Sequence, residues 1–110
     1  MDEALAKALN NLRDQAYFTA RDHGFHEGEV NDGLILALIH SEVSEALDAL
    51  RQNNPPDKHC PQCLSLACEL ADIIIRTLDY AGVQGIDIGE AVLAKMEYNK
   101  NRPYKHGKKF

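Results

Sequence analysis

Two pairs of acidic residues form the pattern with the clearest chemical meaning in this sequence. Glu42 and Glu45 are one pair and Glu69 and Asp72 the other, each with i, i+3 spacing in a largely apolar segment. That spacing places both carboxylates of a pair on one face of a helix. If the two helices lie side by side, four carboxylates surround one point and need a cation to offset their repulsion. The pattern predicts that all four bind Mg²⁺, which Mn²⁺ can replace.

An isolated E-x-x-E on a helix usually lies on a solvated face, so the neighbours of these acids matter. Glu42 and Glu45 share one helical stripe with Leu38 and Ala49. Unpaired acids in an apolar stripe cost roughly several kcal/mol each when buried. An Asp72–Arg76 salt bridge could offset the cost of burying one pair. Two matching pairs in consecutive helices nevertheless favour a metal site. Farther along the two stripes are two acids that we expect at the surface, Asp48 and Asp79.

The hydrophobic periodicity predicts an all-α chain, a four-helix-type bundle formed by a single domain over residues 1–110. The expected helices span about residues 2–23, 33–52 and 64–81, and a fourth begins after Asp87 and ends before Pro103. Asn31 or Asp32 caps the second helix, and Pro55 and Pro56 interrupt the chain after it. Asp87 with Glu90 forms the pattern of a capping box.

Composition indicates a small domain that functions away from membranes. Hydrophobic residues make up 45% of the 110 positions, enough for one core, and a chain this short often completes its burial by forming oligomers. The first residues have neither a basic start nor an apolar stretch, so no signal peptide is expected. The longest apolar run, residues 34–39, is too short to span a membrane. Three cysteines without a secretion signal are typical of reduced thiols in the cytoplasm.

A basic segment closes the acidic chain. Residues 95–110 hold six Lys and Arg and one Glu, a net charge of +5, whereas residues 1–94 hold six bases and sixteen acids, a net charge of −10. Lys95, Asn99 and Arg102 follow i, i+4, i+7 spacing on one helical face, which suits phosphate oxygens better than an apolar core. The acidic body argues against a nucleic-acid-binding surface.

The segment His59-Cys60-Pro61-Gln62-Cys63, with Cys68 nearby, contains part of a zinc ligand set. A second C-x-x-C is missing and Cys68 falls within the third expected helix, so the sequence favours incidental thiols. A zinc-binding helical interaction module without catalysis stays open as the alternative function. A di-iron bundle is a weaker alternative, because it needs E-x-x-H pairs and neither acidic pair has one.

The acidic pairs also carry a family resemblance. With E-x-x-E at 42–45, E-x-x-D at 69–72, ELADIIIRTLDYAG, KMEYNKNRPYKHGKKF and GFH, the chain resembles the MazG-like all-α nucleoside triphosphate pyrophosphohydrolases over most of its length. The resemblance implies an oligomeric bundle, a homodimer or homotetramer with sites near subunit boundaries. It also implies that Glu42, Glu45, Glu69 and Asp72 bind Mg²⁺, and that the triphosphate-binding residues are Lys95, Asn99 and Arg102.

The expected reaction is hydrolysis of a nucleoside triphosphate or its deoxy form to the monophosphate and pyrophosphate, as part of nucleotide-pool housekeeping. Metal held by the acids would polarise the α-phosphorus and lower the pKa of a bound water. Glu42 and Glu45 are the catalytic candidates, one of them as the group that positions or deprotonates this water. The sequence lacks G-x-x-x-x-G-K-[ST], so metal and side chains, rather than a P-loop, must hold the phosphates.

Overall fold

The computed structural model describes residues 2–110, and these residues form four α-helices and one short 3₁₀ helix. The helices are α1 (Glu3–Asp22), α2 (Asp32–Arg51), α3 (Ser65–Gln84), α4 (Ile88–Lys100) and η1 (Tyr104–Gly107). The only β pairing described in this range is a single bridge between Pro56 and Leu64. The prediction of an all-α chain with four helices is therefore confirmed.

Local capping residues explain most of the helix boundaries. Asn31 caps α2 by accepting a hydrogen bond from the Leu34 amide, and Asp87 caps α4 by accepting one from Glu90. α3 continues to Gln84, three residues beyond the predicted end, and stops at Gly85 in the left-handed conformation at φ 66°. Gly82 is therefore inside the helix.

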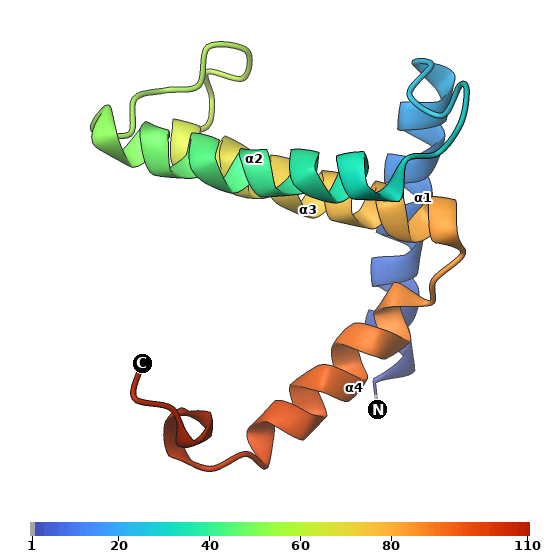
Figure 1. Ribbon diagram of the computed structural model, residues 1–110, viewed down its shortest axis with the longest axis vertical. Helices are drawn as coiled ribbons and strands as arrows, with labels where there is room; N and C mark the ends of the chain where they lie inside the picture. Colours follow the sequence, from blue (N-terminus) through green and yellow to red (C-terminus); the bar gives the residue numbers. More distant parts are fainter. Residues whose placement is uncertain (1) are drawn as a thin grey trace.

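The fourth helix diverges from the three longer ones, which gives the molecule an open shape. α2 and α3 run side by side and are joined by the loop 52–64. α1 crosses them near the N-terminal end of α2 (Figure 1). α4 contacts α1 and leads away from α2 and α3, so the basic C-terminal segment forms a second arm (Figure 1). The molecule measures 40 × 36 × 28 Å along its principal axes.

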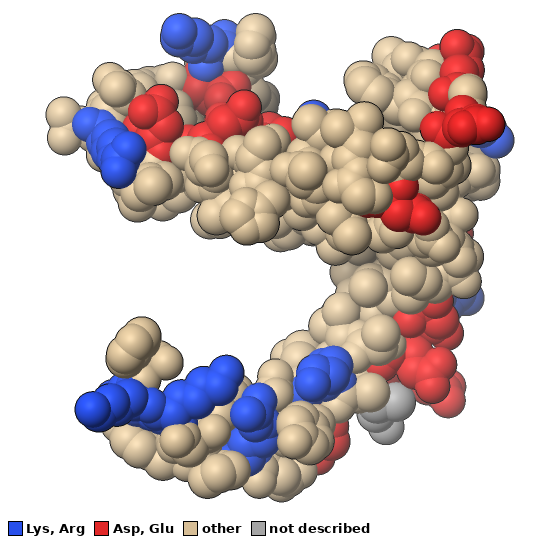
Figure 2. Space-filling model, in the orientation of Figure 1, with Lys and Arg blue, Asp and Glu red and all other residues tan. Residues whose placement is uncertain are grey.

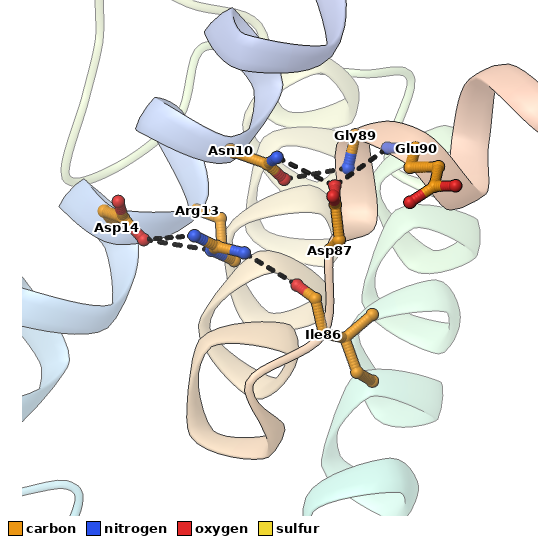
Figure 3. A network of polar contacts seen from close by, with 7 residues as sticks. All are labelled: Asn10, Arg13, Asp14, Ile86, Asp87, Gly89 and Glu90. Atoms are coloured by element: carbon orange, nitrogen blue, oxygen red, sulfur yellow. Dashed lines mark hydrogen bonds and ion pairs between the residues drawn. The ribbon is translucent and has the colours of Figure 1, made fainter.

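A polar junction fixes the start of α4 to α1 (Figure 3). The Asn10 side chain donates to Asp87 Oδ1 and accepts from the Gly89 amide, both at 2.8 Å. Arg13 Nη1 donates to the carbonyl of Ile86 at 2.7 Å. Gly89 is buried, and a Cβ there would overlap the backbone carbonyl of Ala6. The direction of α4 is thus set by close backbone approach as well as by hydrogen bonds.

The apolar core of the described chain is small. Among residues 2–110 the buried apolar residues are Ala46, Ala49, Leu78 and Ala81. Many larger apolar side chains of α2 and α3 are half exposed or more, including Leu34, Leu36, Val43, Leu47, Leu50, Ile74 and Ile75. Exposed apolar side chains gathered on one face are typical of interaction surfaces. None of the described helices is both long and apolar enough to cross a membrane.

Candidate functional site

Three of the four predicted metal ligands converge between α2 and α3. Glu42, Glu45 and Glu69 each offer a carboxylate oxygen, and these oxygens all lie within 4.8 Å of one another. The i, i+3 spacing of the first pair and the antiparallel pairing of the helices produce this convergence. Asp72, one turn farther along α3, is exposed and outside this tight group, but it lines the same pocket as Glu45 and Glu69.

Glu42 is the deepest of these acids and the only buried polar residue among the described positions, with 6% relative exposure. The Arg76 Nε–H donates to its Oε1 at 2.7 Å. Burial alone would raise the pKa of Glu42, but a proton that Glu45 can share with it, the hydrogen bond from Arg76 and the Arg76 charge hold it below the ordinary value. Glu42 is therefore a fixed carboxylate whose other oxygen, Oε2, is buried without a hydrogen-bond partner.

Glu45 has the most strongly shifted pKa of the acids. The hydrogen bond that protonated Glu45 would make to Glu42, then burial, then the charges of Glu42 and Glu69 raise the pKa of Glu45 to about 7. A proton held between neighbouring carboxylates is the expected result when like charges meet without a cation. A carboxyl group with a pKa near neutrality is also suited to act as a general base.

The pKa values of the two acids on α3, Glu69 and Asp72, are raised as well. Burial is the main reason that the pKa of Glu69 is raised, and the negative charges of Asp72 and Glu42 add to it. Burial also raises the pKa of Asp72, assisted by Glu42 and opposed by Arg76. Glu69 Oε2, like Glu42 Oε2, is buried without a partner. Two orphaned carboxylate oxygens within one cluster fit a hard divalent cation as the missing partner.

Comparison with known proteins does not add to this geometry. None of the protein-family models, curated proteins or solved structures matches the chain. The acid cluster is therefore interpreted from the chemistry of its own side chains.

A large open pocket of about 980 Å³ lies beside the acids, between α1, the loop 23–31, α2 and α3. Asp72 and Arg76 line one part of it, and Tyr17, His26 and Asp79 line another. His26 Nε2 and Asp79 Oδ1 are 2.7 Å apart, and the Tyr17 and His26 rings are in contact, tilted by 37° with centroids 4.6 Å apart. Asp79 is therefore a half-buried partner of His26 rather than the surface acid predicted from sequence. An aromatic, mostly apolar pocket with a few fixed polar groups is typical of a small-molecule site.

The predicted phosphate ligands lie on the other arm of the molecule. Lys95 and Asn99 belong to α4 and Arg102 follows it, and α4 contacts α1. Figure 2 shows acidic atoms near the loop end of α2 and α3 and basic atoms along α4 and the C-terminal segment, across the open side. Lys95 and Arg102 both lie over the ring of Tyr98, at 4.8 and 5.6 Å from its centroid. The two cations therefore share one face, but this face does not meet the acids within one chain.

The three cysteines also converge, which the sequence did not predict. Cys60 and Cys63 come from the loop 52–64 and Cys68 from the first turn of α3, with the three Sγ atoms within 4.8 Å of one another. Together with His59, Cys60 and Cys68 line a second pocket, of about 610 Å³, that they share with Glu45, Glu69 and Asp72. The thiol cluster and the acid cluster are thus neighbours.

Proposed function

We propose that the chain is a Mg²⁺-dependent nucleotide pyrophosphohydrolase of the MazG-like kind, which converts a nucleoside triphosphate to the monophosphate and pyrophosphate. The observation that carries the proposal is the Glu42–Glu45–Glu69 cluster, in which two buried carboxylate oxygens have no partner. Mg²⁺ held there would supply Lewis-acid activation of a phosphate group and would lower the pKa of a water. Glu42, Glu45, Glu69 and Asp72 would hold the metal.

The side chains of the cluster differ in ways that fit different tasks. Glu42 is buried and held by Arg76, so it supplies a carboxylate in a fixed position. Glu45 is exposed, so it would be free to face the attacking water. Its pKa of about 7, raised mainly by its hydrogen bond with Glu42, applies to the metal-free cluster, and a bound cation would lower it. We assign Glu45 as the general base and Glu42 as the group that positions it.

The nucleoside would occupy the 980 Å³ pocket, which reaches the acids at Asp72 and Arg76. Tyr17 and His26 also line this pocket with their rings in contact, and the His26–Asp79 pair offers a polar contact for a base edge. A pocket of about this volume accommodates a ligand of drug-like size. The phosphates would then point from this pocket toward the acid cluster.

The basic arm supports an oligomeric site. Lys95, Asn99 and Arg102 suit triphosphate oxygens, yet α4 leads away from the acids of its own chain (Figure 1). Exposed apolar side chains of α2 and α3 need cover. We therefore propose a homodimer or homotetramer in which α4 of one copy brings these three residues to the acids of another, where they stabilise the departing pyrophosphate.

A pyrophosphate-release screen across common and modified nucleotides, with Mg²⁺ and with chelator, tests this function. The proposal predicts Mg²⁺-dependent release that is abolished in Glu45→Gln and retained in Asp48→Asn. Asp48 is the matched control because it is an exposed acid on the same helix. Absence of turnover with every nucleotide, in protein that binds zinc at the cysteines, would instead favour the non-catalytic zinc module, for which the thiol cluster is the supporting observation.

A further inference from the structure

The three cysteines form a compact group that the proposed reaction does not use. Cys60, Cys63 and Cys68 are free thiols of intermediate burial, and their Sγ atoms lie within 4.8 Å of one another. They are all the cysteines that the sequence contains. Cys60 and Cys63 are the ends of one loop turn and Cys68 lies in the first turn of α3, so the approach of Cys68 to the other two is a tertiary feature.

The spacing of the sulfur atoms is close to that of a zinc site. Zn–S bonds of about 2.3 Å in a tetrahedron place sulfur atoms about 3.8 Å apart. The observed limit of 4.8 Å exceeds this separation by only about 1 Å. Small side-chain adjustments would therefore bring all three sulfurs to bonding distance of one ion.

The backbone around the thiols is already held in place. The Asp57 side chain accepts hydrogen bonds from the amides of His59 and Cys60 at 3.0 and 2.9 Å. The Asp57 amide donates to the Cys63 carbonyl at 2.9 Å, and the Cys63 amide donates to the Cys60 carbonyl at 3.0 Å. These bonds close the loop on itself and keep its two cysteines facing Cys68, which limits the ordering that metal binding would require.

A nucleophilic role for these thiols is poorly supported, because it needs a thiolate at neutral pH. Burial and the negative charge of Asp57 raise the pKa of Cys68 to about 12. Burial and the neighbouring Cys63 also raise the pKa of Cys60. A divalent cation reverses this preference, since a coordinating thiol loses its proton outright.

His59 is the candidate fourth ligand, and its side chain would have to turn toward the sulfurs, because its ring nitrogens lie outside the 4.8 Å group. It lines the same pocket as Cys60 and Cys68, and a neutral imidazole completes the Cys₃His set of many structural zinc sites. We propose that Cys60, Cys63, Cys68 and His59 bind one Zn²⁺ ion, which clips the loop 57–63 to the first turn of α3. This site is distinct from the acid cluster, and its existence does not depend on the proposed hydrolysis.

The position of the ion gives it a structural task next to the acids. Cys68 immediately precedes Glu69, and both line the pocket that also holds Glu45 and Asp57. Fixing Cys68 to the loop fixes the start of α3, and with it the wall of this pocket. The zinc-free chain should therefore keep α2 and α3 but lose order in the loop.

Metal analysis of the purified full chain tests the proposal directly. We expect about one zinc per chain after purification without chelator, by analogy with closed structural sites. Co²⁺ substitution should give the intense visible bands of a tetrahedral site and a sulfur-to-cobalt charge-transfer band. In Cys63→Ser and Cys68→Ser the affinity should fall by at least about 10- to 100-fold, the loss that even outer-shell changes cause. Glu45→Gln, which alters only the acid cluster, should retain full zinc.

His59 and the loop have separate readouts. His59→Gln should weaken zinc binding, whereas the matched change His106→Gln at an exposed histidine in η1 should not. Trypsin should cut the zinc-free chain at Lys58, an exposed residue within the loop, and zinc should protect this bond. Cleavage at Lys105, on the other arm, serves as the control and should be unaffected by zinc.

Two results would overturn the zinc site. One is fully reduced wild-type protein with three titratable thiols that gives no tetrahedral Co²⁺ spectrum and binds no zinc. The other is zinc that stays bound in the Cys63→Ser and Cys68→Ser variants but is lost in Glu45→Gln, which would place the ion on the carboxylates. If His59→Gln binds zinc as tightly as His106→Gln, His59 is not a ligand. If the cysteine variants fail to fold, the cobalt spectrum and thiol titration of the wild type still decide the question.

Discussion

The acid cluster and the α1–α4 junction are both built from polar side chains between helices. They differ in whether those side chains have hydrogen-bond partners. At the junction, Asn10 uses its amide as donor and acceptor, and Asp87 accepts from both Asn10 and Glu90 (Figure 3). In the acid cluster, Glu42 Oε2 and Glu69 Oε2 are buried without a partner.

The pKa shifts of the two regions also differ, because they have opposite directions. Hydrogen bonds from the Glu90 amide and the Asn10 side chain hold the pKa of Asp87 below its ordinary value. The pKa of Glu45 is instead raised to about 7, first by its hydrogen bond with Glu42 and then by burial and neighbouring charge. The junction is complete within the chain and therefore serves the fold. The acid cluster leaves two buried oxygens without a partner, as expected of the metal site that we propose.

The largest expected effect of breaking the acid cluster is on catalysis. Glu45→Gln keeps the shape of the side chain but removes a proton acceptor and a metal ligand, so pyrophosphate release should fall by roughly 10²- to 10⁴-fold. The same change removes one of several crowded negative charges. The metal-free variant should therefore melt at or above the metal-free wild type, as measured by thermal unfolding with chelator present.

Asp48→Asn is the control for this comparison, and it should change neither turnover nor melting appreciably. An active Glu45→Gln protein, or one whose metal-free form is clearly less stable than the wild type, would mean that Glu45 is an ordinary structural acid.

A substitution that disrupts the α1–α4 junction should lower the stability of the fold. Gly89→Ala places a methyl group against the carbonyl of Ala6, and overpacking of this kind costs about 1–3 kcal/mol. Gly33→Ala is the matched control, because that glycine also lies in a helix but a Cβ there meets only Asn31 Oδ1 at 3.6 Å. Gly33→Ala should be neutral or slightly stabilising. Equal unfolding free energies for the two variants in urea would contradict the close approach of α1 and α4.

Metal binding should be visible as a smaller effect on stability. Mg²⁺ that binds only the folded state stabilises it by mass action, by about 2.7 kcal/mol at a hundred times its dissociation constant. We expect Mg²⁺ to raise the melting temperature of the wild type, and to do so much less in Glu69→Gln. If Mg²⁺ raised the melting temperatures of the wild type and Glu69→Gln equally, the stabilising ion would not be bound at the acid cluster.

The smallest expected effect is a pH dependence of the metal-free protein. The pKa of Glu45 is raised from 4.5 to about 7, so between these values the folded state binds more protons than the unfolded state. The contribution of Glu45 to stability is therefore fully present below pH 4.5 and lost as the pH rises through 7. Glu69 and Asp72, whose pKa values are raised by burial, act in the same direction.

Melting with chelator, across this pH range, should show a falling melting temperature in the wild type and a flatter profile in Glu45→Gln. Parallel profiles for the two proteins would show that Glu45 is not the group responsible.

Sequence patterns predict the local elements well because local chemistry sets them. Asn31 and Asp87 cap their helices as the sequence indicates, and the paired prolines follow α2. The end of α3 was predicted three residues early, because glycine is a common helix terminator. Gly82 is instead inside the helix, where a Cβ would meet the Tyr17 Cβ at 2.8 Å, so it is required by packing and not by termination.

The site was partly predictable for the same reason. The i, i+3 pairs predict that two acids share a helix face, and three of the four do meet. The convergence of the cysteines was missed because it depends on the path of the loop, which Asp57 and its amide hydrogen bonds determine. The direction of α4, set by the close approach at Gly89, was likewise not encoded in helix periodicity.

Mn²⁺ binding followed by electron paramagnetic resonance tests the central claim most directly, since it detects the metal at the acids without requiring the right nucleotide. We predict saturable binding to the wild type, unchanged binding in Asp48→Asn and in Cys63→Ser, and strongly weakened binding in Glu45→Gln and Glu69→Gln. Wild-type protein that binds no Mn²⁺, or binding that survives in both glutamine variants, would contradict the assignment of this cluster as a metal site.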